Sequence, residues 1–189
     1  MTGGIGAGKS EALAGLARLG AATLSADVVV HELYGDPEVH AAVVNHWGEE
    51  MAPGGTVDRA AVARRAFATP EDREWLEGLI WPKVGQRIAE WRAIESTREP
   101  APPALIVEVP LLFESGMDAA FDATIAIVAA DAVRAERAAA RGHEAVDERT
   151  ARQLGQQEKA QRATYAVQNS GSLDELEHTL SSVLEKLST

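Results

Sequence analysis

The first ten residues carry a spacing of glycine, lysine and serine that suits phosphate binding. Gly3, Gly8, Lys9 and Ser10 fit the pattern G-x-x-x-x-G-K-[ST] of the P-loop. Glycines let the backbone wrap closely around an anion with successive N–H groups pointing inward, and a helix beginning near Gly8 adds the positive end of its dipole. The predicted nucleotide-binding residues of this loop are Gly3, Gly4, Ile5, Gly6, Ala7, Gly8, Lys9, Ser10 and Glu11.

Two side chains at the end of the motif predict the chemistry of the ligand. Lys9 would reach the β- and γ-phosphates of ATP, and the Ser10 hydroxyl would bind Mg²⁺. A glycine-rich turn that matches by chance is the alternative. An amphipathic helix with Leu13 and Leu16 on one face follows at once, and this context favours a functional loop. We therefore expect ATP and Mg²⁺ as ligands, with Lys9 taking part in catalysis.

Asp27 is the candidate for the group that accepts a proton. It closely follows a predicted strand at residues 21–25, and open α/β folds bind their ligands at the carboxyl edge of the sheet. A carboxylate at that edge can take the proton of an attacking hydroxyl. Capping of the helix that follows is an equally good interpretation of Asp27.

Arginines recur at roughly helical spacing in residues 132–153, a region that we expect to form a lid. Arg134, Arg137 and Arg141 could fold over a moving phosphoryl group, and a solvated helix face is the alternative for each of them. Further cations continue the series at Arg149, Arg152, Lys159 and Arg162. In so acidic a chain, this clustering favours binding of polyphosphate.

Composition narrows the class of protein. The chain has 189 residues, which suits a single domain, and a net charge of −11, which argues against a broad nucleic-acid surface. It contains no cysteine, so a disulfide framework and a thiolate metal site are excluded, and its five histidines lack metal-ligand spacing. The sequence shows neither a signal peptide nor a membrane-spanning stretch, so we expect a cytoplasmic protein that binds no membrane. Its oligomeric state is not predicted.

Strands and helices alternate along most of the chain. Near-continuous apolar runs at residues 105–109 and 124–128 are typical of strands in a parallel sheet that is covered on both faces, and residues 165–167 form a further short strand. Helices are predicted at about 131–141 and 145–162. The pattern indicates an α/β fold with a parallel sheet flanked by helices. Residues 36–95 contain no predicted strand, so we interpret them as an inserted helical subdomain that carries the second substrate.

The strand that should precede the P-loop is apparently truncated. Only Met1 and Thr2 stand before Gly3, although a P-loop normally follows a central strand of the sheet. Neighbouring strands would then face unpaired backbone groups, each costing about 1–3 kcal/mol when buried. We therefore expect that the functional protein begins upstream, unless another segment fills the gap.

Several segments together resemble the dephospho-coenzyme A kinase family over nearly the whole chain. Pro110-Leu-Leu-Phe-Glu114 is the most specific of them, because many families share the P-loop. The other matching segments are Thr2–Ser10, Ala26-Asp27 with His31-Glu32-Leu33, Gly55–Arg59 leading to Phe67, Leu76 with Pro82-Lys83-Val84, Arg137 with Arg141, Arg152-Gln153, and Asn169–Ser172.

The resemblance implies a P-loop NTPase three-layer fold, in which residues 1–189 form one kinase domain with a coenzyme A-binding insertion at 36–95 and a lid at 132–153. It implies transfer of the ATP γ-phosphoryl group to the 3′-hydroxyl of dephospho-coenzyme A. On this basis Asp27 matches the family's general base, Arg141 its lid arginine, and Asn169 lies in the segment beside the adenine.

The chain departs from the family pattern at several positions. Ser25 stands where the family usually has Asp, Trp81 where it usually has His, Glu11 where it often has Thr, and Gln168 where it usually has Asp. Two other functions therefore stay open. One is a P-loop kinase for another small acceptor, such as a nucleoside monophosphate, and the other is an inactive nucleotide-binding homologue.

Overall fold

The computed structural model describes residues 1–140 and 153–188. Its strands and longer helices, in chain order, are β1 (Thr2–Gly3), α1 (Lys9–Arg18), β2 (Ala22–Ser25), α2 (Ala26–Leu33), α3 (Pro37–Trp47), α4 (Arg59–Ala66), α5 (Pro70–Glu95), β3 (Leu105–Glu108), β4 (Ile125–Val128), α6 (Asp131–Ala140), α8 (Gln156–Arg162), β5 (Tyr165–Gln168) and α9 (Leu173–Leu187). Short 3₁₀ turns lie at Glu49–Met51, Pro53–Gly55 and Met117–Ala120.

The chain divides into two compact units. Residues 1–25 and those from 94 onward form the first unit, and residues 26–93 form the second. The first unit contains the strands, and the second is helical, as the absence of a strand pattern in residues 36–95 predicts. We describe each unit by itself.

All strand pairs of the first unit are parallel, which confirms the predicted α/β class. β1 pairs with β4 and β4 with β5, while β2 pairs with β3. The first strand is only two residues long, yet the backbone of Met1 also reaches β3. The Met1 carbonyl oxygen accepts from the Val109 N–H at 2.8 Å, and the Met1 nitrogen lies 2.6 Å from the Val107 carbonyl oxygen. The residues before the P-loop thus bridge β3 and β4, and the expectation of upstream residues stays a prediction.

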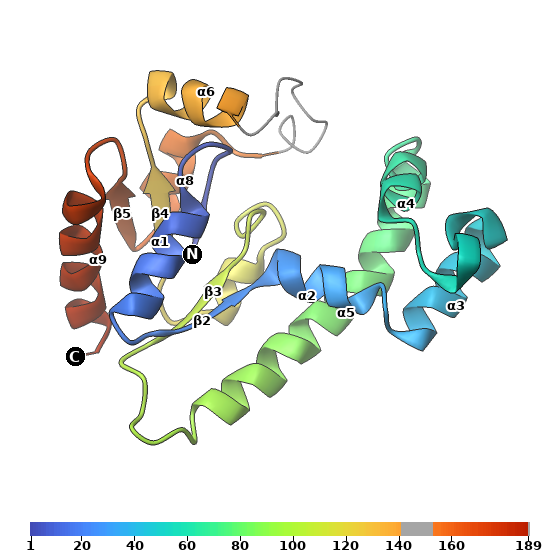
Figure 1. The fold of residues 1–189 in the computed structure, drawn as a ribbon, viewed down its shortest axis with the longest axis horizontal. Helices are drawn as coiled ribbons and strands as arrows, with labels where there is room; N and C mark the ends of the chain where they lie inside the picture. The colour runs from blue at the N-terminus through green and yellow to red at the C-terminus, as the bar shows by residue number, and fades with distance from the viewer. Residues whose placement is uncertain (141–152, 189) are drawn as a thin grey trace. The chain divides into compact units, whose positions relative to one another are not determined.

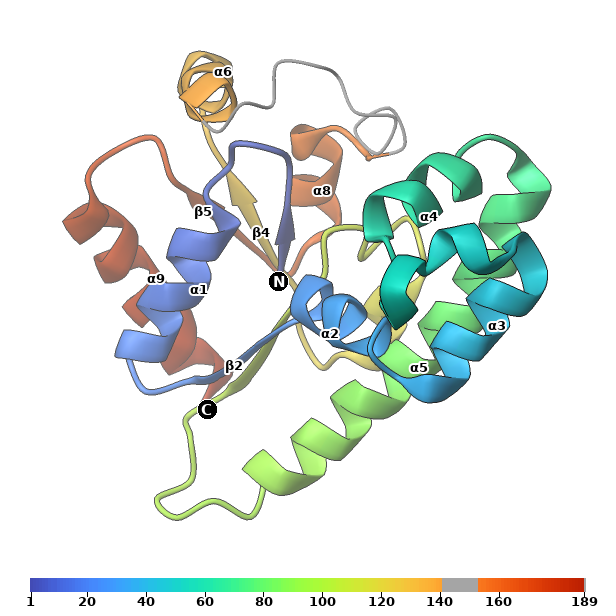
Figure 2. The ribbon, with the colours of Figure 1, turned by 45° about the vertical axis from the view of Figure 1, so that its right-hand side comes forward.

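Helices cover both faces of these parallel strands. Figures 1 and 2 show α1 and α9 side by side on one face of the strands and α8 against the other. Leu16 of α1, Leu180 of α9 and Ile127 of β4 are fully buried in the core between them. A side chain buried to this extent contributes about 1.5–3 kcal/mol to the free energy of unfolding. This packing supports the strand end from which the P-loop leaves the sheet.

Capping residues mark the starts of several helices. The Ser172 hydroxyl accepts from the Glu175 N–H while the Glu175 carboxylate accepts from the Ser172 N–H, so α9 begins with a capping box. In the helical unit the Asp58 carboxylate caps α4, and the Thr69 hydroxyl accepts from the Asp72 N–H at the start of α5. Helix α5 then continues through Pro82 to Glu95.

The predicted helix at 145–162 is confirmed at Gln156–Arg162 and is wrong at residues 153–155. Gln153–Gly155 are not helical, and α8 begins only at Gln156. The Leu154 N–H donates to the Glu114 carboxylate at 2.8 Å instead of a carbonyl of a preceding helical turn, and Gly155 is extended, with φ −55° and ψ 147°. A tertiary contact therefore overrides the helical pattern at this point.

Candidate phosphate-binding site

The predicted P-loop connects the end of β1 to the start of α1. Gly6 and Gly8 have φ values of 73° and 88°, in the left-handed region that side chains other than glycine rarely adopt. Gly8 is also the N-cap residue of α1, and no side chain caps this helix. The free backbone N–H groups of its first turn, together with the helix dipole, make this end of α1 suitable for a phosphate group.

The remaining glycines allow close approach of neighbouring segments. A Cβ atom on Gly3 would lie 2.5 Å from the Ile127 carbonyl oxygen of β4. At Gly4 it would lie 3.1 Å from the Arg134 Nη2, and at Gly6 it would overlap the Arg134 carbonyl oxygen. Close packing against β4 and α6, as well as the backbone angles, therefore favours glycine at these positions of the motif.

Lys9, Ser10 and Glu11 form the first turn of α1. The Lys9 Nζ folds back over the loop and donates to the Gly4 carbonyl oxygen at 3.3 Å, so its charge lies at the loop. Ser10 is exposed. The Glu11 carboxylate pairs with Arg18 at 3.2 Å, and Arg18 also pairs with Glu177 of α9. Glu11 therefore follows the loop in sequence, but its side chain belongs to a surface ion-pair network.

Side chains in the first turns of α6 contact the P-loop. The Arg134 Nε donates to the Ile5 carbonyl oxygen at 3.0 Å, and its Nη1 pairs with Asp131 at 3.0 Å. Gln156 donates to the same Asp131 carboxylate and accepts from the Ala129 N–H. The solvated-face alternative is therefore wrong for Arg134, whose guanidinium contacts the P-loop. The helical spacing of the arginines indicated Arg134 from the sequence, whereas no feature of the sequence indicated Gln156.

Asn169, at the end of β5, joins the loop to α6. Its side chain is buried, and its Nδ2 donates to the Ala7 carbonyl oxygen at 2.8 Å. Its own carbonyl oxygen accepts from the Arg137 Nη1 at 2.9 Å. A Cβ on Gly8 would overlap the Asn169 amide, so this side chain fills the space that the glycine leaves. Asn169 and Arg137 thus brace the P-loop.

Asp27 belongs to the second unit. It is the second residue of α2, which begins directly after β2, and it is exposed. Among the described residues, none forms a hydrogen bond or an ion pair with its carboxylate. Ser25 is the residue before the helix, so the capping interpretation of Asp27 is not supported. The carboxylate is available to a ligand.

The predicted series of cations behaves differently along the chain. Lys159 is completely buried, so it is not part of an open cationic surface. Arg162 is exposed and lies over the Phe113 ring at 4.7 Å. The predicted lid arginine Arg141, together with Arg149 and Arg152, lies outside the described residues. Only α6 and Gln153 of the predicted lid at 132–153 are described.

Two broader properties bear on ligand class. Within residues 1–140 and 153–188, no group of three or more acidic or histidine side chains could hold a metal ion by itself. In the same part of the chain, no helix is long and apolar enough to span a bilayer.

Comparisons with known proteins show which proteins the chain is similar to. A family model described as dephospho-CoA kinase matches residues 1–175. A dephospho-CoA kinase of Symbiobacterium thermophilum is 39% identical over 180 residues, covering 92% of this chain and 74% of the relative. Another, of Deinococcus radiodurans, is 36% identical over 190 residues, covering 99% and 90%. A crystal structure of a Thermus thermophilus protein is 32% identical, with a TM-score of 0.80 and coverage of 100% of this chain and 96% of that one.

Proposed function

The chain belongs to the dephospho-CoA kinase family, and on that premise we propose how its residues divide the work of the reaction. The enzyme uses ATP to phosphorylate dephospho-CoA, giving CoA and ADP. The acceptor is the 3′-hydroxyl of the ribose. Its oxygen forms a bond to the γ-phosphorus while the bond to the β–γ bridging oxygen breaks, and ADP leaves.

The P-loop geometry is the observation that carries the assignment of the nucleotide side. Two left-handed glycines, an uncapped helix start and the Lys9 charge over the loop form a cradle for the phosphates. In this proposal the loop N–H groups hold the β-phosphate, and Lys9 stabilises the negative charge that develops on the transferred group. Arg141 of the lid is proposed to reach the same phosphates.

Ser10 is the proposed protein ligand of Mg²⁺. Ser10 is an exposed residue in the first turn of α1, directly after Lys9, and the described residues offer no carboxylate cage. This fits an ion held mainly by phosphate oxygens and water, as Mg²⁺ usually is. Bound in this way, Mg²⁺ would neutralise phosphate charge.

Asp27 is the proposed general base. The support is its place at the carboxyl end of β2 and its exposed carboxylate with no partner among the described residues. The carboxylate would accept the proton of the 3′-hydroxyl as the oxygen attacks.

The helical unit, residues 26–93, is the proposed site for the coenzyme A portion of the acceptor. It contains the expected insertion, 36–95, almost entirely. Trp81 lies on α5 with 41% of its surface exposed, unlike Trp47, which is 8% exposed. An exposed indole is a suitable surface for an apolar or stacking group of a ligand. We also propose a cytoplasmic location, because both substrates are soluble metabolites.

Transfer of label tests this proposal directly. The protein is incubated with dephospho-CoA and ATP labelled in the γ-phosphate, and the products are separated by chromatography. The expected result is label that co-migrates with CoA. Label that remains in ATP, or appears only as inorganic phosphate, would contradict the assignment.

A further inference from the structure

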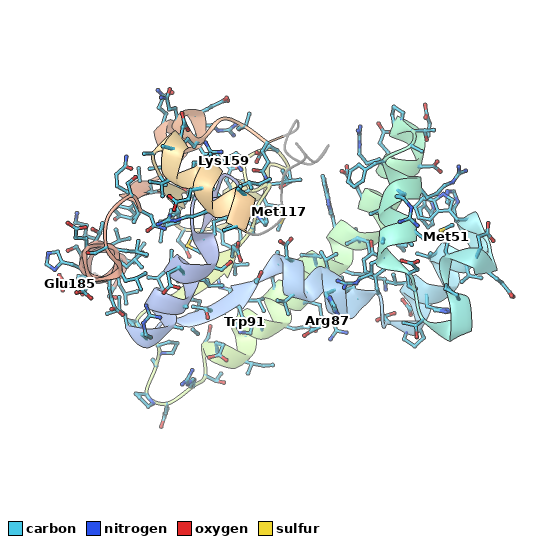
Figure 3. All side chains as sticks on the ribbon, turned by 45° about the horizontal axis from the view of Figure 1, so that its top comes forward. Met51, Arg87, Trp91, Met117, Lys159 and Glu185 are labelled. Atoms are coloured by element: carbon cyan, nitrogen blue, oxygen red, sulfur yellow. The ribbon has the colours of Figure 1, made fainter. Side chains whose placement is uncertain are left out.

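Lys159 of α8 is the largest side chain that the described part of the chain buries completely (Figure 3). Its Nζ donates to the Pro110 carbonyl oxygen at 2.6 Å and lies 3.0 Å from the Glu114 Oε1. Burial lowers the pKa of Lys159, and the neighbouring Glu114 carboxylate opposes this effect. A lysine in such a position cannot reach a ligand, so its function must lie in what it holds in place.

The Glu114 carboxylate joins the segment at Leu154 to this lysine. Its Oε1 also accepts from the Leu154 N–H at 2.8 Å, at the point where the described chain resumes after residue 152. Its Oε2 is buried and has no hydrogen-bond partner among the described residues. Burying a carboxylate with only part of its hydrogen bonds made costs free energy, so the Glu114 carboxylate depends strongly on the charge of Lys159.

Thr2 connects the same network to the P-loop. It is completely buried in β1, and Gly3 of the loop follows it directly. Its hydroxyl donates to the Pro110 carbonyl oxygen at 3.1 Å and lies 3.4 Å from the Lys159 Nζ. Since β1 has only two residues, few ladder hydrogen bonds fix its position. The contacts to Lys159 and Pro110 supply part of what a longer strand would supply.

Stability alone does not explain a buried ion pair. Apolar side chains of similar volume often stabilise a fold as well or better, because they avoid the cost of removing two charges from water. A charged pair differs in that its hydrogen bonds are satisfied in only one arrangement of the backbone groups around it. Here the backbone groups are the Pro110 carbonyl of the loop after β3 and the Leu154 N–H just before α8, and the Thr2 hydroxyl of β1 adds a side-chain partner.

We propose that Lys159 and Glu114 are a positioning pair for ATP binding, which holds β1 and its P-loop in register with the Pro110–Glu114 loop and with Leu154. The kinetic part of this inference rests on the proposed function. Neither residue touches the nucleotide. Both act through the strand that carries the P-loop.

Four variants separate positioning from stability. Lys159→Met removes the charge but keeps most of the side-chain volume, Glu114→Gln removes the other charge, and the double variant leaves no buried charge unpaired. Lys186→Met is the matched control, because Lys186 is an exposed lysine in the last turn of α9. For each variant the melting temperature, the affinity for a non-hydrolysable ATP analogue by calorimetry, and the KM of each substrate are measured.

The positioning account predicts that melting temperature and ATP binding respond differently. Lys159→Met should melt lowest, and the double variant should regain most of that loss because no charge is stranded. The double variant should still bind the ATP analogue about tenfold or more weakly, because a smaller fraction of the protein holds the P-loop in the arrangement that binds ATP. Its KM for ATP should rise more than its KM for dephospho-CoA.

Two outcomes would overturn the inference. One is a double variant that binds the analogue as tightly as the parent, which would make the pair purely structural. The other is an equal rise of both KM values. If Lys159→Met does not fold, Glu114→Gln and the double variant still decide the question. A parent protein that binds ATP but transfers nothing to dephospho-CoA would contradict the proposed function, while the binding comparison would still test the pair.

Discussion

The side-chain amide of Asn169 donates to the carbonyl oxygen of Ala7 at 2.8 Å, and so joins the end of β5 to the middle of the P-loop. The backbone carbonyl oxygen of Asn169 also accepts a hydrogen bond from the Arg137 Nη1 at 2.9 Å. The loop is therefore braced from the sheet and, through Arg137, from α6.

Replacing Asn169 with Ala should loosen the loop without unfolding the protein. It removes the hydrogen bond to Ala7 and leaves that carbonyl oxygen unpaired, which costs about 1–3 kcal/mol. We expect ATP to bind about tenfold more weakly, with little change in the KM of dephospho-CoA. Calorimetry measures the first quantity and steady-state kinetics the second. Gln168→Ala, at the exposed neighbouring position of β5, is the control, and equal effects of the two substitutions would contradict the bracing role.

Replacing Asp27 with Asn should slow turnover and leave ATP affinity nearly unchanged. An amide cannot accept the proton of the 3′-hydroxyl, and general-base catalysis contributes about 10²–10⁴-fold. The kcat should fall by that factor at saturating substrates. Asp174→Asn is a matched control, because Asp174 lies in the first turn of α9 as Asp27 lies in that of α2. Turnover close to that of the parent would show that Asp27 is not the base.

Substitution of Trp81 should affect the binding of dephospho-CoA rather than the binding of ATP. Since its indole is 41% exposed, substitution removes little core packing. We expect Trp81→His to change the KM of dephospho-CoA by more than the KM of ATP, and to leave the melting temperature within a few degrees. Trp91→His, on the same helix, tests whether any tryptophan of α5 has this effect. A change confined to the KM of ATP would remove Trp81 from the proposed acceptor site.

The acid stability of the helical unit should depend on Asp72. The Trp47 indole, which donates to Asp72 at 2.8 Å, is the main cause of a lowered pKa of this carboxylate, followed by the hydrogen bond with Thr69 and the charges of Arg65 and His46. A lowered pKa in the folded state means that the ionised form is stabilised by folding. This stabilisation is present above the unfolded-state pKa of about 3.9 and is lost as the pH falls below that value.

Asp72→Asn therefore should lower the melting temperature at pH 7 and have a smaller effect near pH 3. Melting curves of parent and variant between these pH values measure the difference. Glu71→Gln, at the exposed preceding position, is the control. A difference in melting temperature that stays constant down to pH 3 would show that the charge of Asp72 does not stabilise the unit.

Much of the fold could be predicted because local signals and tertiary structure agree. The apolar runs at 105–109 and 124–128 form β3 and β4, and the Ser172–Glu175 capping box starts α9. The P-loop glycines have the left-handed angles that their spacing requires, at Gly6 and Gly8. Each of these features depends on a few neighbouring residues, so the sequence states it directly.

The supports of the site could not be predicted, because they depend on contacts between distant residues. Lys159 matched a series of surface cations, yet it is buried against Glu114, 45 positions earlier in the chain. The Leu154 N–H, which a helix from 145 to 162 would have used internally, donates to the same carboxylate. Neither contact leaves a periodic pattern, and only the fold brings these groups together.

Release of ADP with different acceptors tests the central claim most directly. A coupled assay compares the parent protein with ATP and Mg²⁺ in the presence of dephospho-CoA, of AMP, and of no acceptor. The account predicts rapid ADP release with dephospho-CoA and only background rates in the other two reactions. Faster release with AMP would indicate a nucleoside monophosphate kinase. Background rates in all three reactions, from protein that binds ATP, would indicate a nucleotide-binding homologue without kinase activity.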